Sequence, residues 1–163
     1  MRLGTASPAI LGTLVGLLAA CGQGGATSDV ALLTQVLSEA RGELGLPANL
    51  AVHPLLALWP EGPLDAPLTR FNLYDSASVA GLVDASAGAY RLCQRDRAGH
   101  CSLAPGQVSV VLSSIRELDG NDLALRLSVF DGRSATDVHR DHIVRLKRGW
   151  AGRWTVAEFR RLN

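Results

Sequence analysis

The chain has 163 residues with 16 basic and 15 acidic side chains, so its formal net charge at neutral pH is only +1. This balance argues against electrostatic capture of nucleic acid, which needs a basic surface. Hydrophobic residues make up 47% of the chain, enough for one core of ordinary size. No phosphate-cradling loop or dinucleotide fingerprint occurs, so we expect a domain with no nucleic-acid partner and no cofactor.

The N-terminus carries a short apolar segment. It spans residues 9–20 and follows Arg2, the only charged side chain before it. A helix that crosses a bilayer needs roughly 20 apolar residues, so this segment is too short to span one. Its length and its small residues before position 21 predict a secretory signal peptide over residues 1–20.

The end of that segment, Leu18-Ala19-Ala20-Cys21, resembles the lipobox of bacterial lipoprotein precursors. The resemblance implies cleavage before Cys21, acylation of its thiol with diacylglycerol and acylation of the new amine. Residues 21–28 then form the lipidated cysteine and a flexible tether, and residues 29–163 form the domain. The absence of Asp at position 22 favours the outer membrane of the cell envelope, facing the periplasm. The alternative is an ordinary signal peptide with a cysteine there by chance.

Two cysteines remain for the domain, Cys93 and Cys101. An even pair in an exported protein predicts a disulfide, and the polar, glycine-containing segment between them suits a hairpin tip. A metal or redox site that includes His100, or two free thiols, are the alternatives. The spacing matches neither a C-x-x-C redox pair nor a usual zinc site.

The first half of the domain predicts two helices and few strands. Apolar residues recur at three- and four-residue steps over residues 28–44, which predicts one long helix that ends at Gly45. Residues 50–59 form an apolar run that Pro54 interrupts, so we expect an edge strand or an irregular buried segment. His53 in this run is expected to be a hydrogen-bonded structural histidine. A short helix is expected from position 75 or 76 to about 85.

The C-terminal third predicts an antiparallel meander. Four strands are expected, over residues 107–118, 123–129, 138–147 and 154–159, joined by short turns. In the second of them, leucines and valine alternate with Ala124, Arg126 and Ser128, which indicates a strand buried on one face. The expected fold class is therefore α+β, with a meander sheet covered by one long N-terminal helix and one short helix.

The last strand contains Gly152, Trp154 and Val156 in a G-x-W-x-V pattern. Together with a leading helix and a curved meander, this pattern resembles the NTF2-like superfamily. The resemblance implies a cone-shaped α+β domain with a pocket between sheet and helix. It implies no particular activity, because that fold serves enzymes, binders and assembly proteins alike.

One cluster of chemically active side chains occurs in the sequence. Asp137, His139 and Asp141 share one face of the expected third strand, whereas His142 lies on the other face with Val144. A His–Asp acid–base pair is one interpretation, and a small metal site is another. The third is a polar strand face beside a turn. We expect no bound metal.

The final hairpin is basic. Its cations Arg145, Lys147, Arg148 and Arg153 surround Trp150, which occupies the expected turn. An amphipathic ring among cations is typical of a surface that meets anionic lipid or an anionic glycan. The alternative is a solvated outer face whose charges keep an edge strand from pairing.

These features favour a membrane-anchored envelope lipoprotein with a non-enzymatic domain that binds a ligand or a partner, such as another envelope protein. A small hydrolase or isomerase with an NTF2-like pocket, using His139 with Asp137 or Asp141, is the first alternative. A lipidated inhibitor or immunity-type protein is the second. A pocket with a convergent histidine and carboxylate would favour the enzyme.

Overall fold

The computed structural model describes residues 29–59, 62–65, 72–75, 77–132 and 138–162. The predicted signal peptide, the lipidation site Cys21, the tether and the site candidate Asp137 lie outside these ranges. No helix within them is long and apolar enough to cross a membrane. The elements in chain order are α1 (Asp29–Glu43), β1 (Leu50–Val52), β2 (Leu55–Leu58), β3 (Asn72–Asp75), α2 (Ala77–Ala85), β4 (Tyr90–Leu92), β5 (Val108–Leu112), β6 (Arg116–Asp119), β7 (Asp122–Asp131), β8 (Val138–Arg148) and β9 (Trp154–Arg161).

Helix α1 forms where the apolar periodicity predicted it and ends as expected. Gly45 adopts φ +63°, a left-handed conformation that glycine reaches without strain, and the Leu46 amide donates to the carbonyl of Arg41. The expectation of a long helix was wrong, because α1 has 15 residues, close to the average for globular proteins. Its buried face consists of Leu32, Leu33, Val36, Leu37 and Ala40.

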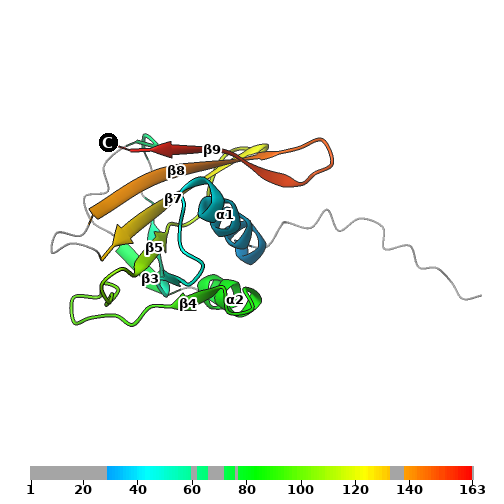
Figure 1. The fold of residues 1–163 in the computed structure, drawn as a ribbon. Coiled ribbons are helices and arrows are strands. Elements are labelled where there is room, and N and C mark those ends of the chain that lie inside the picture. The colour runs from blue at the N-terminus through cyan, green and yellow to red at the C-terminus, as the bar shows by residue number, and fades with distance from the viewer. Residues whose placement is uncertain (1–28, 60–61, 66–71, 76, 133–137, 163) are drawn as a thin grey trace, which may run out of the picture.

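The main sheet is mixed but mostly antiparallel. Its strands follow the order β4-β1-β5-β7-β8-β9, and the neighbours from β5 to β9 are antiparallel (Figure 1). The α+β class and the C-terminal meander are therefore confirmed. The expectation of an edge strand was wrong for residues 50–52, because β1 lies inside the sheet and is parallel to both β4 and β5, whereas residues 55–58 form β2 of a separate two-stranded ribbon. Strand β1 ends at Val52, so Pro54 falls between two strands and removes no hydrogen bond from either.

The first strand of the expected meander is divided into two. Strands β5 and β6 both pair with β7, and residues 113–115 between them belong to neither strand. There the backbone amide of Arg126 donates to the hydroxyl of Ser113 at 2.8 Å. The amide of Ser114 donates instead to the carbonyl of Ala57 in β2. The amide of Arg126 thus bonds to a serine side chain where a regular ladder would offer a backbone carbonyl. This change in hydrogen bonding ends β5 at Leu112.

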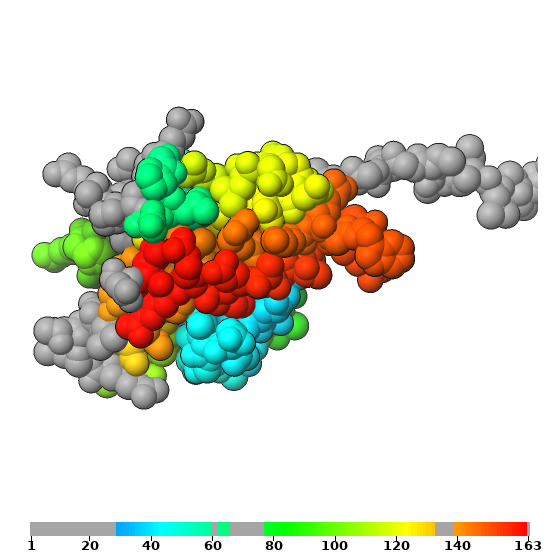
Figure 2. All heavy atoms as spheres, turned by 90° about the horizontal axis from the view of Figure 1, so that it is seen from above, coloured from blue at the N-terminus to red at the C-terminus, as the bar shows by residue number. Residues whose placement is uncertain are grey.

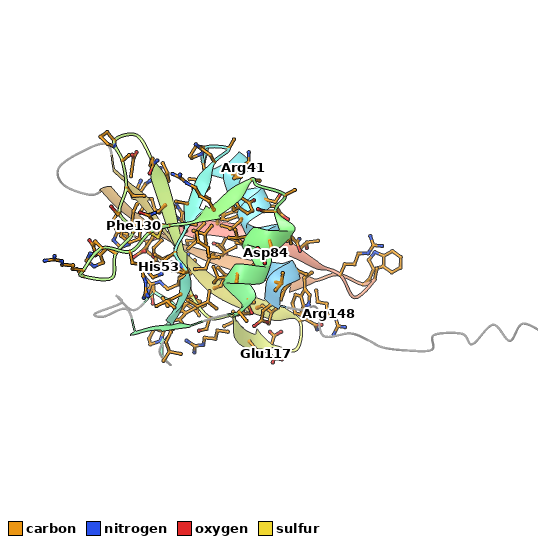
Figure 3. The ribbon with its side chains drawn as sticks, turned by 90° about the horizontal axis from the view of Figure 1, so that it is seen from below. Arg41, His53, Asp84, Glu117, Phe130 and Arg148 are labelled. Carbon is orange, nitrogen blue, oxygen red and sulfur yellow. A yellow bond between two sulfur atoms is a disulfide. The ribbon has the colours of Figure 1, made fainter. Side chains whose placement is uncertain are left out.

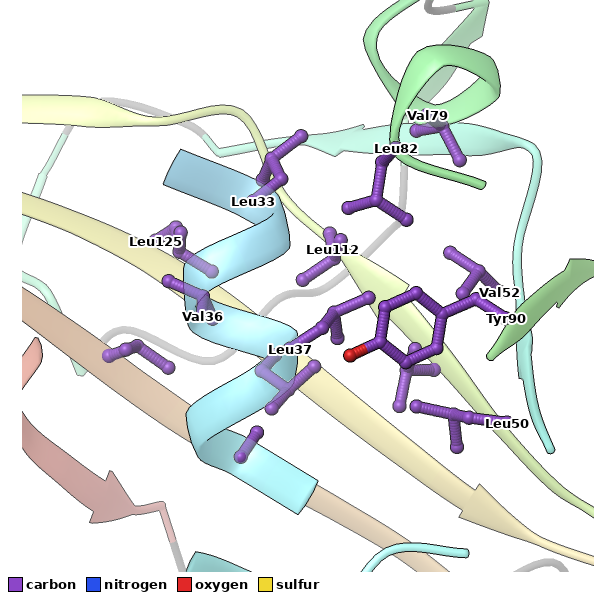
Figure 4. Close-up of a cluster of buried hydrophobic side chains, with 14 of the residues drawn as sticks. Leu33, Val36, Leu37, Leu50, Val52, Val79, Leu82, Tyr90, Leu112 and Leu125 are labelled. Carbon is purple, nitrogen blue, oxygen red and sulfur yellow. The ribbon is translucent and has the colours of Figure 1, made fainter. Parts of the chain in front are cut away.

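Both helices pack on one face of the sheet and fill it with apolar side chains. Figure 4 shows Val36 and Leu37 of α1 facing the sheet, with Leu82 of α2 beside them. All three side chains are completely buried. Every residue of the two apolar clusters lies between Leu32 and Leu162, so a chain that begins after residue 21 retains both clusters.

A small ribbon of β2 and β3 joins the end of β5, and Trp59 after it covers part of the face opposite the helices. These strands are antiparallel to each other, and Ala57 of β2 bridges to Ser113 at the end of β5. Directly after β2, Trp59 packs in a second apolar cluster with Ala124 and Ile143. This cover buries polar residues of β7 that the sequence placed on an outer face, and the candidate site lies among them.

Candidate functional site

A carboxylate with three polar neighbours lies on the face of the sheet opposite the helices. Asp141 of β8 pairs across the strands with Ser128 of β7. The Ser128 hydroxyl donates to Asp141 Oδ1 at 2.5 Å, and His139 Nε2 lies 2.8 Å from the same oxygen. Arg126 Nη2 lies 3.6 Å from the other oxygen, Oδ2. Two of the sequence-predicted residues, His139 and Asp141, are therefore in direct contact.

Arg126 is the buried member of this group. Its side chain is 2% exposed, and its guanidinium lies 6.0 Å from the centre of the Trp59 ring. Burial lowers the pKa of Arg126, and the nearby charge of Asp141 acts in the opposite direction. Arginine still remains protonated at any physiological pH, so Asp141 supplies a counter-charge to a buried cation.

This arrangement differs from a nucleophile and its base. In a serine–histidine pair the hydroxyl donates to the imidazole, which then takes the proton during attack. Here Ser128 and His139 both meet Oδ1 of Asp141, so the hydroxyl proton points to a carboxylate instead. In this geometry Ser128 is not paired with His139, and the group joins β7 to β8 beside the buried arginine.

A pocket opens beside this group, and Phe130 belongs to both. The Phe130 ring stacks on His139, with ring centroids 4.7 Å apart and an angle of 13° between the planes. The same phenylalanine lines a pocket of about 130 Å³. The other lining residues come from the disulfide loop, from β5 and from the segment before β2: His53, Gly99, His100, Cys101, Leu103, Ser109 and Val111. Figure 3 shows His53 and Phe130 lying at the same end of the molecule.

His53 fixes the disulfide loop against the body of the domain. It is 2% exposed, and its Nδ1 accepts from the backbone amide of Leu55 at 3.1 Å. With Nδ1 as an acceptor, Nε2 carries the proton and donates to the carbonyl of Gly99 at 2.9 Å. Both ring nitrogens are thus used, and the expectation of a structural histidine is confirmed.

Ser109 is the polar residue in the wall of the pocket that lacks a partner. It pairs across the strands with Phe130 and is 1% exposed. Its hydroxyl oxygen has no hydrogen-bond partner among the described residues. A buried hydroxyl without a partner costs free energy, so it marks a position where a ligand or water atom would be favourable.

The predicted disulfide is confirmed, and the other cysteine interpretations are excluded. Cys93 and Cys101 are bonded through their sulfur atoms, and their Cα atoms are 5.4 Å apart. Because both sulfur atoms are in the disulfide, neither cysteine is a free thiol or a thiolate ligand for a metal. Among the residues that the structure describes, no group of three or more metal-binding side chains occurs.

His142 lies on the other face of β8, as the sequence predicted. It is 5% exposed, and its Nδ1 has no hydrogen-bond partner among the described residues. Burial lowers the pKa of His142, and the charges of Arg140 and Arg161 lower it further. The carbonyl of Leu127 and the charge of Asp141 oppose this shift with smaller effects.

We expect His142 to destabilise the domain in mild acid. Below about pH 6.5 the imidazole of His142 binds a proton more readily in the unfolded chain than in the folded one, because its pKa is lower in the folded state. The free energy of unfolding therefore falls as the pH falls. Its slope should reach at most about 1.4 kcal/mol per pH unit, and above pH 7 the effect should vanish. Urea unfolding between pH 5 and 8 would measure it. His142→Phe should flatten the curve and the exposed control His100→Gln should not; parallel curves for all three proteins would contradict the assignment.

The basic residues predicted for the last hairpin divide into two groups. Arg145 forms an ion pair with Asp122, with Nη2 and Oδ2 2.9 Å apart. The others lie in the exposed run 147–153, where the guanidinium of Arg148 lies 6.0 Å from the centre of the Trp154 ring. Trp150 at the turn is completely exposed. The structure therefore separates Arg145 from the proposed anionic-surface residues Lys147, Arg148, Trp150 and Arg153.

Several residues of the candidate site were not predicted. Ser109 and Phe130 gave no signal, because their role comes from a pocket wall that three distant segments build. Arg126 and Ser128 were assigned to an outer face by alternation alone. The one signal for Arg126 was its position as a charged residue inside an otherwise apolar strand. Comparison with protein-family models, curated proteins and solved structures finds no match to this chain.

Proposed function

We propose that the chain is a bacterial envelope lipoprotein, anchored through lipid on Cys21, whose domain binds a small uncharged molecule without transforming it. The lipobox-like sequence before Cys21 supports the anchor. The disulfide supports export, because such bonds persist in oxidising compartments. We place the domain at the outer membrane, facing the periplasm. The mass of the mature natural protein tests the anchor, which requires acyl chains on a chain that begins at Cys21.

The observation that carries the binding function is the pocket beside the disulfide loop. Its volume of about 130 Å³ is close to that of a dry cavity of about 150 Å³ that holds benzene. Leu103, Val111 and Phe130 supply apolar walls, and the Ser109 hydroxyl supplies one polar group. A ring-sized neutral molecule with one hydrogen-bonding group fits this combination.

The absence of catalysis is proposed from the way that Asp141 is used. A general base needs a free lone pair within reach of a substrate proton. One carboxylate oxygen of Asp141 already contacts the Ser128 hydroxyl and the His139 ring nitrogen. The other oxygen lies beside the guanidinium of the buried Arg126. His53, the histidine within the pocket wall, is bonded through both ring nitrogens.

Phenol is the probe that tests the pocket. Amide chemical shifts of residues 99–111 should move on titration, with a dissociation constant of about 1 mM, which corresponds to a modest energy per ligand atom. Benzoate should bind at least tenfold more weakly, because its charge would be buried without a counter-charge. Leu103→Trp should fill the pocket and abolish binding of phenol. Leu92→Trp is the matched control, since Leu92 is exposed and does not line the pocket.

Equal shifts with phenol and benzoate, or equal loss of binding in both leucine variants, would refute the proposed site. Ordered water at Ser109 with no phenol binding would have the same consequence. Binding by the wild type that survives Leu92→Trp and disappears in Leu103→Trp would support it.

A second candidate function, a hydrolase or isomerase, rests on the contact between His139 and Asp141. We also propose the finer fold assignment, NTF2-like, which the leading helix and the five antiparallel strands from β5 to β9 support. That resemblance implies a pocket between sheet and helix, whereas buried side chains such as Leu37 fill this interface. The enzyme would have to use His139 from the opposite face, where it shares Phe130 with the pocket.

A further inference from the structure

The hairpin between β8 and β9 projects from one end of the domain (Figures 1 and 2). All seven residues from 147 to 153 are exposed. They include the cations Lys147, Arg148 and Arg153 and contain no carboxylate. Trp150 at the tip is exposed over its whole surface. A large aromatic ring without cover, surrounded by like charges, is a feature that folding of the domain does not explain.

The carboxylates near this hairpin lie at its base. Asp122 is the cross-strand neighbour of Lys147, but its carboxylate pairs with Arg145. Asp119 is the last residue of β6, and its carboxylate accepts from the backbone amide of Asn121. Both acidic side chains are thus engaged with other groups. The positive charge of the hairpin is concentrated around Trp150, and the ring can reach a surface together with the cations.

Helix α1 runs beside β9 and in the same direction. Gln35 donates to the carbonyl of Trp154 at 3.0 Å, near the start of β9. Further along both elements, Glu39 and Glu43 line a groove with residues 156–159. The first residue of α1, Asp29, lies six residues before Gln35, a distance of about 9 Å along the helix. The beginning of the domain therefore lies at the end where the hairpin projects, as Figure 1 also shows.

We propose that the hairpin over residues 147–153 binds the surface of an anionic lipid bilayer and orients the domain on it. The inference rests on the proposed anchor at Cys21, because seven residues between the anchor and Asp29 span at most about 25 Å. The chain thus enters the domain on the side that faces the bilayer. The tryptophan ring suits the headgroup region, and the cations meet anionic headgroups.

Vesicle flotation of the unlipidated chain 22–163, which retains both apolar clusters, tests this proposal. Binding to vesicles with one third phosphatidylglycerol should exceed binding to pure phosphatidylcholine by at least tenfold and should fall with salt. Replacing Lys147, Arg148 and Arg153 by glutamine should weaken it by on the order of 100-fold, about fivefold per cation. Trp150→Ala should weaken it about tenfold and abolish quenching of tryptophan fluorescence by brominated lipid.

The control removes three exposed cations from the other end of the domain. Replacing Arg91, Arg95 and Arg97 by glutamine takes away the same charge from β4 and the disulfide loop. This variant should bind vesicles within threefold of the wild type. Equal weakening by both triple variants, or equal binding to neutral and anionic vesicles, would overturn the proposal.

Two further outcomes are decisive. If a soluble sulfated polysaccharide binds as tightly as the vesicles and Trp150→Ala changes neither interaction, the hairpin binds anionic glycans and the membrane proposal fails.

The flotation needs no lipid on the protein, so its result is independent of the anchor. If the natural protein carries no acyl chains, the proposed anchor fails even where the chain 22–163 floats. If the natural protein is acylated and the chain 22–163 does not float, only the hairpin proposal fails.

Discussion

Replacing Asp141 by alanine is expected to lower the free energy of unfolding by about 3–5 kcal/mol. The substitution takes the carboxylate away from Arg126, whose side chain is 2% exposed, and from the two donors on Oδ1. Without the charge of Asp141, less of the desolvation cost of the buried cation is compensated, and this loss is the main part of the expected effect. Urea unfolding at pH 7 would measure the change.

Two variants separate the charge effect from simple truncation. Asp84→Ala removes an exposed carboxylate of α2 and should change the free energy of unfolding by less than about 0.5 kcal/mol. The double variant Arg126→Met with Asp141→Leu removes both charges, so it should be markedly more stable than Asp141→Ala. If the double variant is as unstable as the single one, the carboxylate is not stabilising a buried charge.

The sequence predicted the elements whose signals are local. The start of α1 and its end at Gly45 follow from periodicity and from the freedom of glycine at positive φ. The disulfide followed from two cysteines at the ends of a polar loop. The contact of His139 with Asp141 follows from the two-residue period of a strand, which places them on one face.

The parts that could not be predicted depend on contacts between distant segments. Residues 50–52 read as an edge because Pro54 follows, yet a strand that stops before the proline can pair on both sides. Arg126 was predicted to lie on an outer face. The alternation of apolar and polar residues assigns a side chain to one face of a strand but does not show what covers that face. Trp59, more than 60 residues before Arg126 in the chain, supplies cover on that face. The pocket is also formed by segments that are distant in the sequence, so its lining residues could not be predicted.

Removal of the disulfide is expected to lower the free energy of unfolding by about 2–3 kcal/mol. The bond joins residues eight positions apart, and closing a loop of this length in the unfolded chain accounts for about 2.5 kcal/mol on the chain-entropy model. The folded side contributes as well, since Gly99 inside the loop receives the Nε2 proton of His53. Denaturant unfolding of Cys93→Ala with Cys101→Ala would measure the sum.

Reduction supplies the matched control for this pair of substitutions. Dithiothreitol should shift the unfolding midpoint of the wild-type chain 22–163 to that of the double variant, and it should leave the double variant unchanged. The lost loop should also weaken phenol binding, because Cys101 and Leu103 form part of the pocket wall. An unchanged midpoint in a fully reduced wild type would mean that hydrogen bonds such as the one between His53 and Gly99 hold the loop in place. The pocket should then bind phenol whether or not the cysteines are joined.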